Sequence, residues 1–366
     1  MLVPFVVSQS NYPVPSTADS STDSGATTTT QVIVGAGAVT GTNAGIAFIT
    51  GAPAMPQLTV KINGLDSSNL TVDWRLEVTS ERTERGTQDN IDLPFSPGES
   101  SAGGPGIVDN EPINQAWNIF DDYPSSPQSF FGGNVTIYYR IKKADGTYIE
   151  PSEQTLTTFK IRGLNPLDAT AKNFIITGLA GGANSDVFQF AWAQVQEESL
   201  DPVRNTVYNQ FNSGGAAAEL PNFTGPDGWG IAQLDKPLGV SANTEEVYNW
   251  QLNLNKFYQE MDEKITVQQN FFAAVAAAYP TDTDAQNPPT TTLYGTSISA
   301  LAAGAITLYN GAGGCPFTTL GGVQYQNPWT FNHSPPTGQP KWQYTKNEQD
   351  YLHQVLQQYQ GAPYNE

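Results

Sequence analysis

Apolar and polar positions alternate with a period of two through much of the first half of the chain. Such alternation predicts strands buried on one face, because successive side chains of a strand point to opposite sides of the sheet. The segments that show it are 58–62, 70–78, 135–141 and 155–161. The dipeptide Asp145-Gly146 lies between two of these runs and suits a hairpin turn, since both residues tolerate the positive φ that a type I′ turn requires. We therefore predict antiparallel strands in this region.

The predicted strands resemble those of an immunoglobulin-like β-sandwich, which we place at residues 56–162. Trp74 lies on the second strand and is a candidate core anchor. The segment 86–114 is rich in Gly, Pro and Ser, which indicates an insertion within this domain.

The hydrophobic period changes to that of a helix after residue 162. Asn165-Pro-Leu-Asp168 is a helix-start signal, because Pro fixes φ and Asp can cap the amides of the next turn. Helical patterns then cover 185–199, 243–277, 296–309 and 347–358. We therefore predict a mainly α-helical second domain, with a C-terminal tail, over residues 163–366.

Residues 1–55 differ in composition from both predicted domains. Ser and Thr dominate residues 8–31, and such a stretch buries too little apolar area to offset its ordering entropy. Short β-prone pieces set among glycines follow up to residue 55. We predict a low-complexity arm, which is either a linker with extended pieces or a segment that docks on a partner or on the next domain.

The chain of 366 residues is strongly acidic, with 16 basic and 35 acidic side chains and a net charge of −19. A nucleic-acid-binding surface needs clustered Lys and Arg, so we expect no nucleic-acid partner. The same charge argues against binding to an anionic membrane surface. No apolar run approaches the roughly 20 residues of a membrane span, and the start of the chain lacks the features of a signal peptide.

The segment Glu197-Glu198-Ser199 carries the first candidate chemistry. It follows an apolar-faced helical pattern, and its register places Glu198 close to the buried stripe of that helix. Burial favours the protonated form of a carboxyl group, which suits a general acid. The alternative is a pair of solvated charges at a helix end.

Two further segments have unusual composition. Residues 225–236 contain three glycines that let another backbone or a ligand approach, with Asp227 and Asp235 close by. The alternative here is a tight hairpin with Trp229 in the core. Residues 308–311 end the Ala-rich helical pattern with Tyr309-Asn310-Gly311, which could equally be an ordinary helix cap.

Together and in this order, the three segments resemble the lysozyme-like superfamily of peptidoglycan-cleaving enzymes. Glu198-Ser199 matches the catalytic Glu-Ser of that family, Gly230-Ile-Ala-Gln233 its Gly-Leu-Met-Gln motif, and Tyr309-Asn310-Gly311 its Ala-Tyr-Asn-Gly motif. The segment 227–236 is most similar to goose-type lysozymes and related soluble lytic transglycosylases. The resemblance covers roughly residues 165–315 and leaves the sandwich, the arm and the tail outside it.

The resemblance implies cleavage of the MurNAc–GlcNAc β-1,4 bond, with Glu198 as the general acid. Asp227 matches an aspartate suited to positioning water on the opposite face of the sugar, and such an inverting pair needs its carboxyl groups about 6.5–9.5 Å apart. Ser199 would support the helix end beside the substrate. The other residues expected to contact substrate are Gln233, Asp235, Tyr309 and Asn310.

The chain departs from the family pattern at several points. Ala232 stands where the second motif has Met, Leu308 where the third has Ala, and the gap between Glu198 and Gly230 is longer than usual. If Asp227 does not face the cleft, transglycosylation to an anhydro product is favoured over hydrolysis. The main alternative is a catalytically inactive structural or saccharide-binding component, and chitin is an alternative substrate.

The arrangement of domains suggests how such an enzyme reaches its substrate. A sandwich joined to a muramidase without a signal peptide resembles enzymes delivered by a phage tail or a contractile injection system. We therefore expect peptidoglycan glycan strands and a carrier protein as partners, with delivery to the cell wall or periplasm. His333, His353 and Cys315 are the only histidines and cysteine, so a catalytic triad, a disulfide or a zinc cluster has little material. We expect no cofactor.

Overall fold

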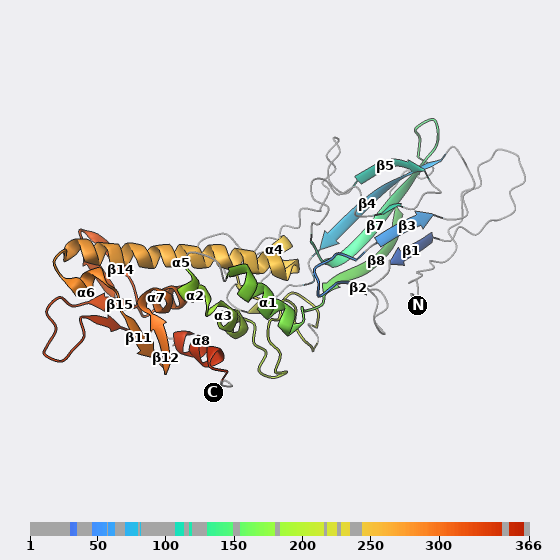
Figure 1. Cartoon of the computed structure of the whole chain (residues 1–366). Helices are drawn as coiled ribbons and strands as arrows, with labels where there is room; N and C mark the ends of the chain where they lie inside the picture. Colours follow the sequence, from blue (N-terminus) through green and yellow to red (C-terminus); the bar gives the residue numbers. More distant parts are fainter. Residues whose placement is uncertain are drawn as a thin grey trace, which may run out of the picture. The chain divides into compact units, whose positions relative to one another are not determined.

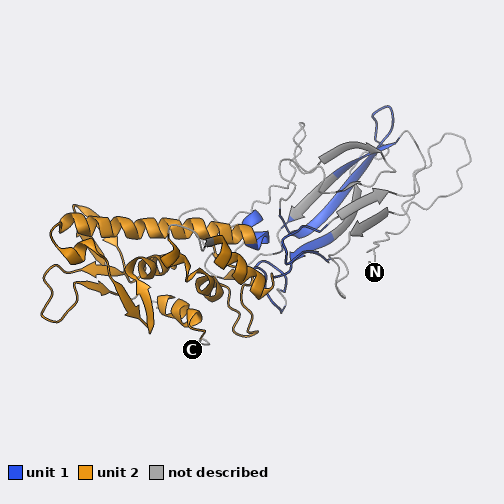
Figure 2. Cartoon of the chain, viewed as in Figure 1, with its two compact units in different colours: residues 1–165, 210–221, 238–250 blue, residues 166–209, 222–237, 251–366 orange. Residues whose placement is uncertain are grey.

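The computed structural model contains strands and helices that separate into two compact units along most of the chain (Figure 2). The residues that the structure describes are 30–34, 46–56, 58–62, 70–79, 81, 107–112, 117–118, 130–148, 154–179, 184–215, 218–224, 228–234, 244–345 and 351–361. Unit 1 comprises Met1–Asn165, Gln210–Pro221 and Leu238–Trp250. Unit 2 comprises Pro166–Asn209, Asn222–Pro237 and Gln251–Glu366. The fold is therefore mixed α and β.

Unit 1 contains a five-stranded sheet in the order β2-β8-β7-β4-β5 (Figure 1). Its strands are β2 (Ile46–Ile49), β4 (Thr71–Thr79), β5 (Ile107–Pro112), β7 (Gly133–Lys142) and β8 (Gln154–Gly163). A second sheet of three strands has the order β1-β3-β6, with β1 (Thr30–Val34), β3 (Leu58–Ile62) and β6 (Trp117–Asn118). The four strands predicted from the period-two pattern are confirmed as β3, β4, β7 and β8.

The core of the five-stranded sheet follows the predicted alternation. Val135 and Ile137 of β7 are fully buried, whereas Asn134 between Gly133 and Val135 is exposed. Trp74 of β4 is buried as expected and packs against Tyr139, with ring centroids 6.1 Å apart. A hairpin turn is present at the predicted position, where Gly146 N donates to Lys143 O at 2.9 Å. The predicted type I′ geometry is wrong, because Gly146 has a positive φ of 83° but Asp145 does not.

Strand β2 lies in the predicted arm, for which docking on the next domain is one of the two alternatives. Residues 46–49 follow this alternative, because they form an edge strand whose Ala47, Phe48 and Ile49 are buried. The strand pairs with β8 in parallel, so the sheet is mixed rather than purely antiparallel. A four-residue apolar run among glycines has no clear period, and its pairing depends on a strand more than 100 residues later.

Unit 1 also includes the segment Gln210–Pro221, although in the sequence this segment follows the first helices of unit 2. The segment is held at the end of β8, where Gly163 N donates to Glu219 O at 3.0 Å. The Asn165 side chain accepts from Phe211 N at 2.7 Å and donates to Phe211 O at 2.8 Å. The Phe211 ring lies directly against Gly163, where a side chain would have no room.

We expect Gly163→Ala to destabilise unit 1 by about 1–3 kcal/mol, because its methyl group would overlap the buried Phe211 ring. Urea unfolding followed by tryptophan fluorescence measures this free energy. Gly178→Ala is the matched control, since the nearest atom to its added methyl group is 3.9 Å away. An equal effect of the two substitutions would contradict the role given to Gly163.

Unit 2 is built around the long helix α5 (Trp250–Ala278), which begins at the last residue of unit 1. Buried residues recur along it every three or four positions: the apolar Leu254, Phe257, Met261, Ile265, Phe271 and Val275, with the polar Gln268 between Ile265 and Phe271. This continuous stripe explains why so long a helix forms. The helices of unit 2 besides α5 are α1 (Asp168–Leu179), α2 (Ser185–Phe188), α3 (Ala191–Glu198), α6 (Thr283–Gln286), α7 (Ala300–Tyr309) and α8 (Tyr351–Tyr359). Helix α4 (Thr244–Tyr248) belongs to unit 1.

Short hairpins complete unit 2. They are β9 (Phe223–Thr224) with β10 (Gly228–Trp229), β11 (Thr290–Leu293) with β12 (Thr296–Ser299), β13 (Phe317–Leu320) with β14 (Val323–Gln326), and β15 (Trp329–Phe331) with β16 (Trp342–Tyr344). The predicted helix at 296–309 begins only at Ala300, because Ser299 caps it by accepting from Ala302 N at 3.1 Å. No helix in the described part of the chain has the length and apolar character needed to cross a membrane.

Candidate active site

Glu198 is the last residue of α3 and is half-buried. Its Oε1 accepts a hydrogen bond from the hydroxyl group of Tyr351, the first residue of α8. Helices α3 and α8 pack together, and the next residue back, Glu197, accepts from the Gln358 side chain at 2.9 Å. The C-terminal helix therefore holds both glutamates at the end of α3.

The surroundings of the Tyr351 side chain keep its hydroxyl group as a hydrogen-bond donor to Glu198. Burial raises the pKa of Tyr351 well above its usual value, and the charge of Glu198 and its hydrogen bond add to the shift. The phenol therefore keeps its proton and stays a hydrogen-bond donor at neutral pH. A donated hydrogen bond fixes the orientation of the carboxyl group that accepts it.

Tyr309 is the last residue of α7 and belongs to the third motif, which lies beside the second. Its hydroxyl donates to Ala232 O at 2.8 Å, and its ring meets Phe257 of α5 edge-on with centroids 5.2 Å apart. Tyr309 lies near enough to Tyr351 that the charge of an ionised Tyr309 would raise the pKa of Tyr351, which donates a hydrogen bond to Glu198. The structure therefore brings the end of α3, the Gly230–Gln233 segment and the end of α7 together.

A chain of hydrogen bonds also links the first motif to the second. Asn209 donates to Ser199 O at 2.8 Å, and Asn222 donates to Asn209 O at 3.1 Å. Asn222 O in turn accepts from Gly230 N at 2.8 Å. The long gap between Glu198 and Gly230 thus contributes residues that hold the two motifs at a fixed separation.

The turn that carries the second motif is fixed by Asn253 of α5. Its fully buried side chain accepts from Ala232 N and donates to Trp229 O, both at 3.0 Å. Trp229 and Leu234 close the turn with a pair of backbone hydrogen bonds of 3.0 Å. Ala232 is therefore held from both sides, by Asn253 at its N–H and by Tyr309 at its carbonyl oxygen.

Gln233 is mostly buried and has the positive φ of 48°. Its Nε2 donates to Gly230 O at 2.8 Å, and within the described part of the chain its Oε1 has no hydrogen-bond partner. A methyl group on Gly228 would lie 2.5 Å from that Oε1, which explains the glycine there. As placed, the Gln233 amide supports the turn; contact with a substrate would require it to move.

The remaining predicted site residues are Ser199, Asn310, Asp227 and Asp235, and they differ in burial and in whether the structure describes them. Ser199 is buried and its Oγ donates to Val195 O at 2.8 Å, so it supports the helix end and offers no surface to a substrate. Asn310 is exposed beside Tyr309 and caps α7, with the following Gly311 at a φ of 94°. Asp227 and Asp235 lie outside the described residues.

Asn253 and Tyr351 belong to the site but are not among the residues predicted from the sequence, although each lies in a recognisable sequence pattern. Asn253 lies among the apolar positions that repeat along α5, and a polar residue on a buried stripe implies a specific partner. Tyr351 begins a short amphipathic helix far from the other motifs. Its partner could not be identified, because the pair is separated by 153 residues.

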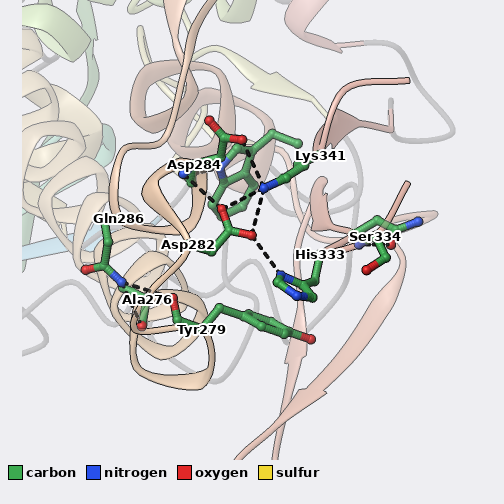
Figure 3. A network of polar contacts seen from close by, with 10 residues as sticks. Ala276, Tyr279, Asp282, Asp284, Gln286, His333, Ser334 and Lys341 are labelled. Atoms are coloured by element: carbon green, nitrogen blue, oxygen red, sulfur yellow. Dashed lines mark hydrogen bonds and ion pairs between the residues drawn. The ribbon is translucent and has the colours of Figure 1, made fainter. Parts of the chain in front are cut away.

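A second polar cluster joins α6 to the β15–β16 hairpin (Figure 3). The buried Asp282 carboxylate accepts from Lys341 Nζ at 2.8 and 2.9 Å, pairs with His333 Nδ1 at 2.8 Å, and caps α6 by accepting from Asp284 N at 3.1 Å. These hydrogen bonds, that of Lys341 most of all, hold the pKa of Asp282 at about 2 in spite of burial. Asp282 is engaged by three partners, so the cluster is a structural clamp.

We expect Asp282→Asn to lower the melting temperature at neutral pH, because Asn cannot form the ion pair with Lys341. The pKa of Asp282 lies near 2 in the folded chain, below its ordinary value of 3.8. Its stabilising contribution is therefore complete above about pH 5 and is lost as the pH falls through about 2. Thermal unfolding followed by circular dichroism should show the difference between wild type and variant shrinking over this range.

Asp284→Asn is the control for this clamp. Asp284 lies 3.2 Å from Lys341, but its side chain is 58% exposed, so the substitution should cost less. A difference between wild type and Asp282→Asn that stays constant down to pH 2 would contradict the assignment.

Comparison with models of protein families, with curated proteins and with solved structures finds no match to this chain. Its function is therefore inferred from the residues around Glu198 and from the motifs that they carry. Glu198 is a half-buried carboxyl group that accepts a hydrogen bond from Tyr351.

Proposed function

We propose that the chain is a glycosidase that cleaves the β-1,4 bond between MurNAc and GlcNAc in peptidoglycan, with Glu198 as the general acid. The observation that carries this proposal is the meeting of the three motif segments in unit 2. Glu198 accepts a hydrogen bond from Tyr351, and Tyr309 donates one to Ala232 O of the Gly-Ile-Ala-Gln segment. Tyr309 also lies near enough to Tyr351 to affect its pKa when ionised. The three motif segments are far apart in the sequence, and their proximity in unit 2 supports the motif matches.

The local chemistry supports the role of Glu198. A general acid must present its proton in a fixed direction, and the bond from Tyr351 fixes one carboxyl oxygen of Glu198. The carboxyl group is half-buried at a helix end, where it can meet solvent and substrate while one side rests on protein. Within this proposal, unit 2 is a lysozyme-like domain and unit 1 an immunoglobulin-like domain.

Asp227 decides the type of reaction within this proposal. Hydrolysis with inversion requires a second carboxylate that positions water, about 6.5–9.5 Å from the acid. Asp227 is the residue proposed for this task. If it does not act, the sugar's own hydroxyl attacks instead and a 1,6-anhydro product results.

The test is digestion of purified peptidoglycan, with the released muropeptides identified by mass spectrometry. We expect cleavage between MurNAc and GlcNAc, with reducing ends from hydrolysis and 1,6-anhydro ends from transglycosylation. Chitin oligomers digested in parallel test the alternative substrate. If neither polymer is cleaved but peptidoglycan co-sediments with the protein, the chain is a saccharide-binding component, and the catalytic proposal is wrong.

The net charge of −19 supports a proposed mode of delivery. Cell walls are anionic, and like charges slow the encounter of two diffusing partners. We propose that a carrier such as a phage tail or a contractile injection system brings the enzyme to the wall. Purification of the chain with its native assembly tests this part separately from catalysis.

A further inference from the structure

The turn between β11 and β12 has a strained backbone. Leu293 pairs with Thr296, so Tyr294 and Gly295 form a two-residue turn. Both have a positive φ, 49° for Tyr294 and 83° for Gly295, as a type I′ turn requires. Glycine adopts this conformation freely and asparagine tolerates it, whereas a bulky side chain there costs free energy. The turn alone therefore gives no reason for a tyrosine at position 294.

The Tyr294 side chain packs against helix α8. Its ring is stacked on the imidazole ring of His353, with centroids 4.2 Å apart and 22° between the two planes. Directly after the last residue of α8, Gln360 Nε2 donates to Tyr294 O at 2.9 Å and to Thr296 Oγ1 at 2.6 Å. The turn therefore contacts α8 near both of its ends, and Figure 1 shows the β11–β12 hairpin beside this helix.

Helix α8 is held from two sides. Tyr351 donates to Glu198 and Gln358 donates to Glu197, both on α3. Residues seven apart lie on one face of a helix, whereas residues two apart are separated by about 200°. The α3 contacts at positions 351 and 358 and the turn contacts at 353 and 360 therefore lie on different faces. A helix of nine residues is not stable alone, so these contacts determine where it lies.

We propose that Tyr294 is a positioning residue for Glu198, because its ring holds α8 where the Tyr351 hydroxyl donates to that carboxyl group. The inference rests on the proposed function, in which Glu198 is the general acid. His353 lies two residues after Tyr351, so a movement of α8 at His353 carries the phenol with it. Hydrogen bonds weaken steeply away from their preferred distance and angle. This role explains the strained tyrosine, since backbone strain persists where the surrounding structure requires it.

Tyr294→Asn is the test substitution, because Asn suits the positive φ of the turn but has no ring. We expect kcat for cleavage of soluble peptidoglycan fragments to fall about three- to tenfold with KM unchanged, the rate equivalent of one lost aromatic pair. The melting temperature should change little, because relief of the strained φ offsets part of the lost contact. An unchanged kcat, or a loss confined to KM, would overturn the proposal.

Tyr294→Phe tests whether the ring carries the effect. It keeps the stack on His353, so we expect it to retain at least about half of the wild-type kcat. Equal losses in Tyr294→Phe and Tyr294→Asn would show that the stacked ring is not the cause, and the proposal would be wrong. If Tyr294→Asn does not fold, Tyr294→Gly removes the same ring at a residue that adopts the turn freely, and the same loss of kcat is expected.

Tyr279→Asn is the matched control. Tyr279 is also half-buried in unit 2, and its ring is stacked on His333 with centroids 5.1 Å apart and 12° between the planes. His333 pairs with Asp282 rather than belonging to α8. We therefore expect a lower melting temperature and an unchanged kcat. A fall in kcat as large as that of Tyr294→Asn would show a general effect of losing a Tyr–His pair, and the positioning role would be wrong.

A double-mutant cycle with Tyr351→Phe tests the route of action. If Tyr294 acts through the Tyr351 hydroxyl group, Tyr294→Asn should have little further effect on kcat once that hydroxyl group is gone. Full additivity of the two effects would overturn this route.

Carbon-13 NMR of protein labelled at the glutamate carboxyl carbons keeps this inference separate from the proposed function. The signal that disappears in Glu198→Gln identifies Glu198. In Tyr294→Asn its chemical shift should move toward the value found in Tyr351→Phe, because the same hydrogen bond is weakened. An unmoved signal contradicts the positioning role. A moved signal, together with a wild type that does not cleave peptidoglycan, contradicts the proposed function alone.

Discussion

Glu198→Gln is expected to lower the rate of peptidoglycan cleavage by about 10²- to 10⁴-fold, the usual contribution of a general acid. Gln has nearly the size of Glu and can still accept the hydrogen bond from Tyr351, but it has no proton to give to the glycosidic oxygen. The fold should therefore persist while catalysis is lost. Initial rates of muropeptide release, with melting temperatures measured in parallel, test both statements.

Glu197→Gln is a closely matched control for Glu198→Gln. Glu197 is the preceding residue, it bonds to Gln358 on the same partner helix, and burial raises the pKa of its carboxyl group. The chemical change is identical, so non-specific effects on α3 and α8 should be similar. We expect Glu197→Gln to retain most of the activity. If it loses as much as Glu198→Gln, the acid has been assigned to the wrong glutamate or the two act together.

Asn253→Leu is expected to destabilise unit 2 by about 2–3 kcal/mol. The Ala232 N–H would be left buried without its 3.0 Å acceptor, and an unpaired buried donor costs most of its desolvation free energy. Trp229 O keeps Leu234 N as a partner, so the cost falls mainly on Ala232. Because Ala232 O is the anchor of the Tyr309 hydroxyl, cleavage of peptidoglycan should also fall. Urea unfolding and initial rates measure the two effects.

Asn255→Leu is the matched control for this substitution. Asn255 lies on the same helix two residues later and is exposed, so its replacement should change the free energy of unfolding by less than about 0.5 kcal/mol. Similar losses of stability in the two variants would mean that helix propensity, rather than the hydrogen bonds to the 229–234 turn, explains the effect.

The sequence predicted those parts of the fold whose signals are local. The period-two segments became β3, β4, β7 and β8. The helical pattern at 185–199 became two helices, α2 and α3, of which α3 ends one residue before the predicted end. The tail hairpins at 317–344 were missed, because each strand is only three or four residues long. The segment of strand β2 is β-prone in sequence, but its parallel pairing with β8 could not be predicted, because that pairing is a long-range property.

In the candidate site, too, residues with local sequence signals could be predicted, whereas those that depend on distant partners could not. Glu198, Tyr309 and Asn310 could be named from short motifs because each lies at a helix end with a recognisable pattern. Their supports could not be named, because Asn253 and Tyr351 act through hydrogen bonds to residues far away in the sequence. For Gln233 and Ser199 the motif identified the position, whereas burial determines what the side chain can do.

The hydrogen bond between Tyr351 and Glu198 also determines when, during synthesis and folding, the candidate site becomes complete. Contacts between residues distant in sequence form late, since the intervening chain must first lose its conformational freedom. During synthesis, α3 emerges from the ribosome 153 residues before its partner tyrosine. A nascent chain therefore carries the acid without the group that orients it. On the proposed function, the ability to cut cell wall arises only when α8 docks, after the rest of unit 2 has been made.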